Sequence, residues 1–298
     1  MKRAVRSLLL VTLLSSIASA QGFELERVAL NPGAKHTFFS QTGDALEAMD
    51  LRVSLLGHYQ HLPLVYVVDG SAVGAYVRSR WTTHLVAAFG VHKYVEVAAQ
   101  VPVVLSQQGD DLSRFGLTQV PSVAMGAPWL QVRSGFLRQS DEMPLDLGLS
   151  LALSLPLGST EALTKDPGAG LAFVPKLGAG RAFGPIRLGL EVGALIRGTQ
   201  VLSPASPEVR DEIGSQFSGA FSVSTVKLPV NAELTARLTA PFTATGVSAE
   251  ILAAVRFAIL KQLELSVLGG PGIGKAPGTP AFRVLFGVTW TPSFRAEN

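Results

Sequence analysis

Charged residues of both signs recur inside otherwise apolar segments of this chain, each flanked by aliphatic neighbours. Arginines and glutamates that share one surface can neutralise one another in ion pairs, or they can bind and steer ionic solutes. Both uses remain open at this point. The candidates for this chemistry are Arg52, Arg78, Arg80, Glu96, Arg133, Asp146, Arg187, Glu191, Glu233, Arg237, Glu250, Arg256 and Arg283, accompanied on the same faces by His58, His84, Lys176 and Glu264.

The element that positions such residues is clearest between Leu145 and Leu157, where every second residue is leucine. A helix turns by about 100° per residue and would scatter these leucines, whereas a strand puts all of them on one face. Ordinary strands have about 5 to 6 residues, while a tilted strand that crosses a bilayer needs about 9 to 11. The segment therefore predicts a transmembrane β-strand.

The same alternation continues along most of the chain, and turn residues divide it into twelve strands. Even strand numbers are usual in bacterial single-chain barrels, which alternate short periplasmic turns with longer outer loops, and the spacing here follows that alternation. We predict an all-β fold, a transmembrane antiparallel up-and-down β-barrel. The expected strands are residues 51–67, 73–91, 94–104, 127–137, 144–156, 170–182, 185–198, 212–223, 228–239, 247–259, 262–270 and 280–291.

The direction of each face follows from the cost of placing charge in lipid. Between residues 230 and 239, Glu233 and Arg237 share the parity opposite to Val230, Leu234 and Leu238. A lipid-facing Arg at the bilayer midplane costs roughly 2 to 4 kcal/mol, so the polar face must line the lumen. Twelve strands enclose more room than the roughly eight that side chains alone can fill. If a path is open, the excess of arginine in the first four strands favours anionic solutes.

The start of the chain has the features of a secretory signal peptide over residues 1–20: basic residues, an apolar run from Leu8 to Leu14, and the small-residue site Ala18-Ser19-Ala20. This segment holds three basic and no acidic residues, so its removal leaves 22 Lys and Arg against 22 Asp and Glu. A neutral mature chain gives no reason to expect a nucleic-acid partner. The chain has no cysteine, which excludes disulfides and thiolate chemistry.

The remaining organisation follows from these assignments. We expect the barrel over residues 51–291 in the outer membrane, in contact with its lipid, and a short tail over 292–298. Residues 21–50 are either a periplasmic cover or a plug that enters the lumen. Trp81, Trp129 and Trp290 lie in predicted strands, where aromatic girdles form at membrane interfaces.

Three motifs resemble phosphate-binding or metal-binding sites, but the residues around them argue against these functions. Gly269 to Lys275 fits the start of a phosphate-binding loop, but Ala276 replaces the magnesium-binding hydroxyl and the following prolines forbid the helix. His58 and His61 are three residues apart and point to opposite faces of a strand. Asp110 and Asp111 fit a solvated loop pair better than a calcium site. We therefore expect no cofactor and no metal site.

Enzymatic activity is not expected either. His84 has serines nearby in the sequence, as in outer-membrane phospholipases, but no strand presents a Ser, His and Asn set on its outer face.

Several short phrases resemble a known family: Leu55-Leu56-Gly57-His58-Tyr59-Gln60-His61 with Pro63-Leu64-Val65, Gln100 to Val104 with Gly109-Asp110-Asp111-Leu112, and Gly269 to Gly272 with Ala276 to Val284. Together they are similar to the N-terminal barrel of myxobacterial outer-membrane proteins of the TraB type, whose members often continue into an OmpA-like domain. The printed chain stops at Asn298 without one. The resemblance implies a barrel fold and, for function, cell-surface exchange.

Two hypotheses follow for function. The first is a passive outer-membrane channel or transporter that conducts small solutes past the charged face. The second is a non-conducting scaffold or recognition partner, which presents the outer loops at residues 105–126 and 199–211 to another surface protein. A soluble secreted β-sandwich is the third alternative, and it would show no reason for alternating long and short connections.

Overall fold

The computed structural model describes residues 22–26, 30–33, 35–68, 70–166, 169–202, 211–226, 228, 230–242, 246–274 and 276–292. The predicted signal peptide and nearly all of the predicted tail lie outside these ranges. Among the described residues, no helix is long and apolar enough to cross a membrane.

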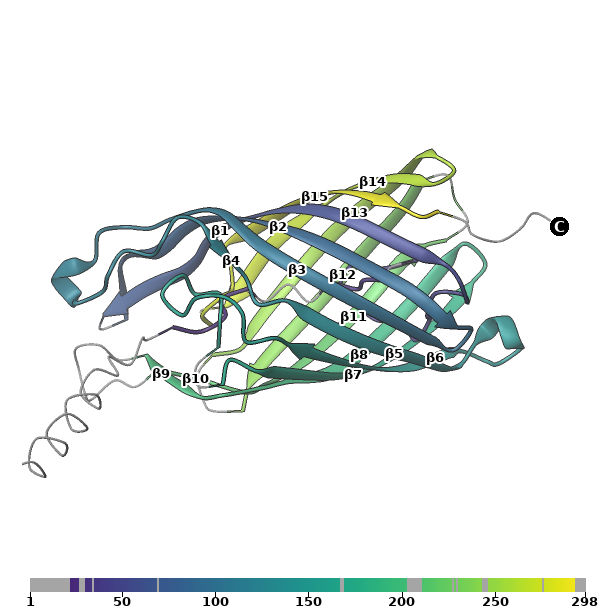
Figure 1. Ribbon diagram of the computed structural model, residues 1–298, viewed down its shortest axis with the longest axis horizontal. Coiled ribbons are helices and arrows are strands. Elements are labelled where there is room, and N and C mark those ends of the chain that lie inside the picture. Colours follow the sequence, from purple (N-terminus) through teal and green to yellow (C-terminus); the bar gives the residue numbers. More distant parts are fainter. Residues whose placement is uncertain are drawn as a thin grey trace, which may run out of the picture.

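Within the described chain, twelve long strands form one closed antiparallel barrel, which confirms the predicted fold class (Figure 1). Each strand pairs with its sequence neighbour in the barrel, and β1 closes the ring by pairing with β15. The barrel strands are β1 (Leu51–Val68), β2 (Ser71–His92), β3 (Val95–Gln108), β5 (Trp129–Leu137), β6 (Asp146–Ser154), β7 (Ala172–Phe183), β8 (Ile186–Arg197), β11 (Gln216–Thr225), β12 (Val230–Pro241), β13 (Ser248–Leu260), β14 (Leu263–Gly274) and β15 (Phe282–Trp290).

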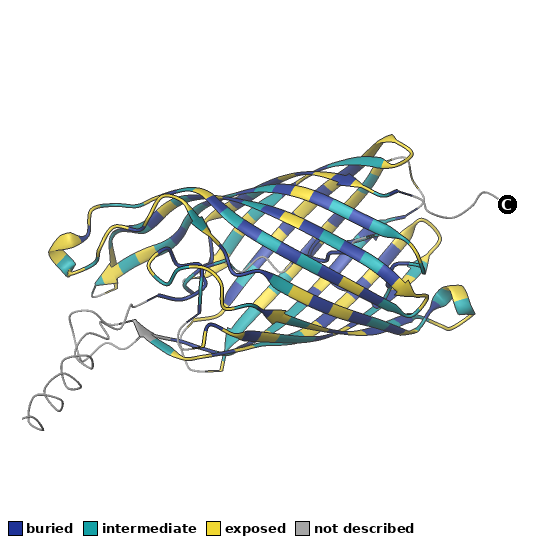
Figure 2. Cartoon of the chain, viewed as in Figure 1, coloured by how far each residue is buried: buried dark blue, intermediate teal, exposed yellow. Residues whose placement is uncertain are grey.

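Alternation decides which side of each strand faces outward. Figure 2 shows buried and exposed residues alternating along the strands. The outward positions carry the aliphatic side chains, including Leu149, Leu151 and Leu153 of the leucine segment, all about 40% exposed. Their exposure leaves a continuous apolar band for lipid, which is the arrangement of a transmembrane barrel.

The connections differ at the two ends of the barrel. Short turns join β2 to β3, β7 to β8 and β13 to β14 at the end where β1 begins and β15 ends. Longer connections at the opposite end carry the short strands β4 (Ala124–Met125), β9 (Gln200–Leu202) and β10 (Asp211–Ile213), which the sequence did not predict. Within the described ranges, two single-turn helices, Ser113–Phe115 and Gln139–Asp141, also lie in connections.

An aromatic cluster marks the outer boundary of the lipid-facing band. The rings of Tyr59 and Trp81 on adjacent strands lie 4.8 Å apart, and Tyr59 is 5.9 Å from Phe282. His61 stacks on Phe282 at 5.0 Å. Amphipathic rings of this kind gather where hydrocarbon meets head groups. Beyond this cluster, β1 and β2 continue as a hairpin that projects past the barrel (Figure 1).

Residues 22–26, 30–33 and 35–50, here called the lumenal segment, lie inside the barrel. At one end, the Leu25 N–H donates to the carbonyl of Leu163, in an outer connection, at 3.1 Å. At the other end, Met49 N–H donates to the Gly90 carbonyl at 2.8 Å, beside a short turn, and the chain then enters β1. The segment therefore runs through the lumen from the outer mouth to the turn-rich end. The described residues of this segment thus lie within the barrel.

Candidate functional site in the barrel lumen

The charged side chains on the lumen face lie close enough to neutralise one another. Arg187 on β8 is 2.7 Å from Asp146 on β6, and Lys176 on β7 is 3.0 Å from Glu191 on β8. Further pairs join Arg52 to Glu264 (2.8 Å), Arg133 to Glu96 (3.5 Å), Arg237 to Glu250 (3.5 Å) and Arg283 to Glu250 (2.6 Å). Buried charges are stable only when paired in this way.

The structure brings twelve of the thirteen predicted lining residues to the lumen side. Arg237 is partly exposed there, and the other eleven are buried: Arg52, Arg80, Glu96, Arg133, Asp146, Arg187, Glu191, Glu233, Glu250, Arg256 and Arg283.

Arg78 is the exception, and its predicted place beside Arg80 is wrong. His61 pairs with Ser79 but Leu64 pairs with Val77, so two residues of β1 oppose the single residue Arg78. The alternation along β2 also reverses at this irregularity: Val77 and Arg80 are both buried, and the Arg78 side chain between them is 58% exposed.

Arg78 instead stabilises the part of the β1–β2 hairpin that projects past the barrel, here called the outer extension. It forms an ion pair with Asp110, whose other carboxylate oxygen accepts the Ala75 N–H at 2.8 Å. These two hydrogen bonds, from the Ala75 backbone and then from Arg78, hold the pKa of Asp110 below its usual value. The contact is structural and lies outside the lumen.

Acidic residues of the wall bind the backbone of the lumenal segment. Glu233 Oε2 on β12 accepts the Phe38 N–H at 2.7 Å. In the same way, Glu191 Oε2 on β8 accepts the Gln41 N–H at 2.8 Å, and Glu96 Oε2 on β3 accepts the Leu46 N–H at 3.0 Å. Three glutamates from three separate strands thus satisfy three N–H groups that extended backbone would otherwise leave buried without partners.

Arginines of the wall bind the carbonyl groups of the same segment. Arg187 donates to the Thr42 carbonyl at 2.8 Å, and Arg133 to the Asp44 carbonyl at 3.3 Å. Arg256 donates to the Lys35 carbonyl at 3.3 Å, and Arg197 to the Glu24 carbonyl at 3.2 Å. The charged face that the sequence predicts therefore serves in large part to hold an internal peptide.

Glycines on the lumen face leave room for this backbone. A Cβ atom at Gly178 on β7 would lie 2.3 Å from the Gln41 carbonyl oxygen, and one at Gly148 on β6 would lie 2.8 Å from the Gly43 carbonyl oxygen. Both separations are far inside van der Waals contact. Glycine is therefore required where the lumenal segment passes closest to the wall.

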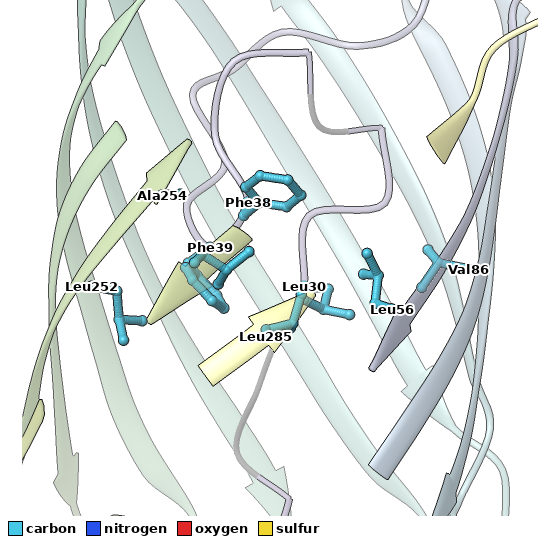
Figure 3. Close-up of a cluster of buried hydrophobic side chains, with 9 residues drawn as sticks. Leu30, Phe38, Phe39, Leu56, Val86, Leu252, Ala254 and Leu285 are labelled. Atoms are coloured by element: carbon cyan, nitrogen blue, oxygen red, sulfur yellow. The ribbon is translucent and has the colours of Figure 1, made fainter. Parts of the chain in front are cut away.

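A cluster of buried apolar side chains joins the lumenal segment to one side of the wall, as Figure 3 shows. Phe38 and Phe39 of the lumenal segment, buried together with Leu30, point toward the wall on this side. The wall contributes six residues from β1, β2, β13, β14 and β15. These are Leu56, Val86, Leu252, Ala254, Leu268 and Leu285. We call this the sealed side.

The other side of the lumen contains a cavity of about 110 Å³, room for several water molecules. Its wall comes from β3, β5, β6, β7, β8, β11 and β12, and Gln41 of the lumenal segment faces it. The lining mixes charged, apolar and uncharged polar residues, and six residues of the wall contribute the uncharged polar groups. They are Gln100, Gln131, Ser150, Gln216, Ser218 and Thr239. We call this the cavity side.

A second apolar cluster lies at the outer mouth. Phe23 and Leu25 of the lumenal segment pack against Val77 of β2, with Leu163 from the β6–β7 connection and Ile213 of β10. Arg80 donates to the Leu163 carbonyl at 3.1 Å, which draws that connection inward. The path from outside is therefore covered by residues of the outer connections.

Sequence reasoning missed the polar groups that do not alternate with long aliphatic residues. Asp166, in an outer connection, turns inward and pairs with Arg197 at 3.1 Å. Glu24 and Asp44 of the lumenal segment also face the wall, with Arg80 3.9 Å from Glu24 and Arg187 3.7 Å from Asp44. The available signal was the presence of these charged residues in segments that lack strand periodicity.

Residues 269–274, which carry the glycine-rich motif, form part of strand β14 rather than a loop before a helix. His58 points into the lumen, while His61 stacks on the outer surface. The lumenal His58 does lie near two other potential metal ligands, Glu26 and His84, a grouping that the sequence did not suggest.

Comparison with known proteins finds the same barrel fold in solved structures. No family model and no curated protein matches the chain. Among solved structures, an outer membrane channel from Pseudomonas putida F1 aligns with a TM-score of 0.65 at 12% identity, covering 84% of this chain and 98% of that one. The KdgM porin (TM-score 0.51, 8% identity) covers 82% of this chain and 99% of its own length. The NanC porin (TM-score 0.51, 8% identity) covers 80% and 98%.

At these identities the likeness shows the fold alone. The chain is a β-barrel of the outer-membrane type, with the architecture of channels and porins. Its neighbours are channels and not enzymes.

Proposed function

We propose that this protein is a passive outer-membrane channel for small polar solutes, in which the lumenal segment is the gate. The observation that carries the proposal is the asymmetry of the lumen: apolar contacts seat the segment on the sealed side, and a polar cavity remains on the other. A barrel filled only for rigidity has no need of such a cavity, because side chains of the wall could fill it.

The lining supports polar solutes of low charge. The cations next to the cavity are already neutralised, Lys176 by Glu191 and Arg197 by Asp166. Amides and hydroxyls also face the cavity, and they exchange hydrogen bonds with a passing solute without the desolvation cost of a bare ion. Because the lumenal arginines are paired with acidic residues, we expect a weaker preference for anions than the number of arginines alone suggests.

The absence of cysteine allows a direct test. Ser40 of the lumenal segment and Ser222 on β11 are joined by a hydrogen bond of 2.7 Å between their hydroxyls, close enough for a disulfide after replacement. The Ser40→Cys, Ser222→Cys variant should lock the segment to the wall. The matched control is Ser54→Cys, Thr289→Cys, whose hydroxyls lie 2.9 Å apart within the wall itself.

The measurement is conductance of the refolded proteins in planar bilayers, before and after reduction. We expect the locked variant to pass little current until dithiothreitol is added, and the control to conduct equally in both states. Equal currents from the oxidised and reduced locked variant would show that the segment is not a gate. No current from any correctly folded protein would contradict the channel.

A second candidate function rests on the outer extension. The β1–β2 hairpin projects beyond the aromatic cluster, and Val65 and Val67 on it are exposed. Residues 113–118 pack against this hairpin through Tyr66 and Phe115, whose rings are 5.3 Å apart. A rigid, partly apolar projection suits recognition of another surface protein, as the resemblance to exchange proteins implies. Folded protein that passes no current would favour this function.

A further inference from the structure

Three potential metal ligands meet between the lumenal segment and the wall. His58 on β1 and His84 on β2 both point inward, and neither has any exposed surface. Their rings are 5.9 Å apart because His58 pairs with Thr82, which places His84 one inward position farther along the neighbouring strand. Glu26 of the lumenal segment approaches them, with Oε2 3.3 Å from His58 Nδ1. One ligand atom from each residue lies within 4.8 Å of the other two.

Groups around this cluster orient the rings and the carboxylate. Gln100 Nε2 lies 3.0 Å from His84 Nδ1, and Gln60 Nε2 donates to Glu26 Oε1 at 3.0 Å. With Nδ1 engaged by Gln100, the other ring nitrogen of His84, Nε2, is buried without a hydrogen-bond partner among the described residues. Leaving a buried polar atom unsatisfied is costly, and this one belongs to a residue that has a ligand atom within 4.8 Å of those of Glu26 and His58.

The donor set selects the kind of ion. Two imidazoles and one carboxylate suit Zn²⁺ and neighbouring divalent transition metals, whereas Mg²⁺ and Ca²⁺ prefer oxygen ligands alone. A ligand histidine donates its second ring N–H to an acceptor, and Gln100 fills this role when its amide turns to present Oε1 instead of Nε2 to His84 Nδ1. Glu26 and Gln100 also line the cavity, so an ion that enters the cavity reaches the cluster.

We propose that Glu26, His58 and His84 bind a divalent transition-metal ion of the Zn²⁺ type, which fastens the lumenal segment to β1 and β2. In the free protein, Arg283 lies 3.2 Å from His58 Nε2, so that nitrogen accepts and Nδ1 carries the proton toward Glu26. Metal binding at Nδ1 moves the ring proton to Nε2. Arg283 then gives up His58 and keeps its contacts with Glu250, which its Nε donates to at 2.8 Å.

The first test needs no variant. The refolded full-length protein in detergent is titrated with Co²⁺, whose visible absorption reports nitrogen and oxygen ligands, and its thermal unfolding is followed with Zn²⁺ or Mg²⁺ added. We expect saturable binding of one Co²⁺ per chain, and a melting temperature raised by several degrees with Zn²⁺ but not with Mg²⁺. Absence of saturable binding at 100-fold molar excess would overturn the proposal and leave a hydrogen-bonded structural cluster.

Variants then locate the ion. His84→Gln should lower affinity at least tenfold, while His61→Gln, which changes a histidine on the outer surface, should leave it unchanged. Gln100→Leu should weaken binding about tenfold by releasing the orientation of His84. Equal affinity in His84→Gln and the parent protein would contradict the assignment. The site does not depend on conduction, so a barrel that binds metal without passing current would reject only the channel.

Discussion

The two sides of the lumen use opposite means to hold the same segment. On the sealed side, Phe38 and Phe39 are buried against aliphatic residues of β13 to β15, β1 and β2. On the cavity side, Glu191 and Arg187 hold residues 41 and 42 through hydrogen bonds, and empty space remains beside them. Apolar packing supplies affinity without direction, whereas charged hydrogen bonds fix position. Apolar packing therefore supplies most of the affinity on the sealed side, and hydrogen bonds to charged residues fix the position of the segment on the cavity side.

The largest effect should follow from removing the main apolar contact of the sealed side. Phe39 is 1% exposed, and Phe39→Ala is expected to destabilise the seated segment by about 3 to 5 kcal/mol. Proteolysis of the lumenal segment and current through the barrel should both increase. Phe286→Ala, which removes a half-exposed ring from the lipid face, is the control and should leave the current unchanged. A Phe39→Ala variant with parental protease resistance would show that packing does not seat the segment.

On the cavity side, Glu191→Gln is expected to change ion selectivity. The change leaves Lys176 buried without its anion, which costs about 3 kcal/mol, and adds a net positive charge next to the cavity. Reversal potentials in a salt gradient should shift toward anion selectivity, while the sealed side stays intact. Glu161→Gln, at an exposed outer residue, is the matched control. An unchanged reversal potential would mean that ions do not pass Lys176.

Gly178→Ala tests how closely the segment approaches the wall. The new Cβ would lie 2.3 Å from a backbone oxygen, so residues 41–43 must shift, at a cost of about 1 to 3 kcal/mol. Amide hydrogen exchange at Gln41 should become faster. Gly57→Ala, where nothing lies within 4 Å of the added atom, should change neither exchange nor stability. Equal exchange in the two variants would contradict the close approach.

The smallest predicted effects are the changes in stability when either of two serines of the wall is replaced by alanine. Ser222 bonds to Ser40 at 2.7 Å, so Ser222→Ala is expected to lower stability by about 1 kcal/mol. Ser150 Oγ borders the cavity side and has no hydrogen-bond partner among the described residues, so Ser150→Ala should change stability by less than about 0.5 kcal/mol. Chemical denaturation in detergent measures both. Similar losses would show that the bond between Ser222 and Ser40 adds nothing to stability.

The barrel could be predicted from the sequence because its signal is local. Alternation within one strand already decides which residues face lipid, as in the leucines of β6, and short turns mark where strands end. The strand boundaries agree with the structure to within a few residues for this reason. β6 itself is shorter than expected, since its pairing with β5 and β7 ends at Asp146 and Ser154.

The site was only half predictable because it depends on contacts between distant residues. Glu233 was recognised as lumenal, but its partner Phe38 lies 195 residues away and has no periodic signal. Arg78 was misplaced because the bulge at Leu62 and Pro63 follows from pairing between two strands, not from the composition of either one. The cavity is the space that several strands and the lumenal segment leave together, so no single stretch of sequence encodes it.

The way the wall holds the lumenal segment has a consequence for substitutions in either of them. Glu96, Glu191 and Glu233 recognise N–H groups, which every residue except proline provides. A substitution at Gln41 therefore keeps the bond to Glu191, whereas a substitution of Glu191 itself removes it. We therefore expect a change at Glu191 to disturb this contact more than a change at residue 41, whose side chain the bond does not use. The side chains of Phe38 and Phe39, in contrast, are fixed by their packing.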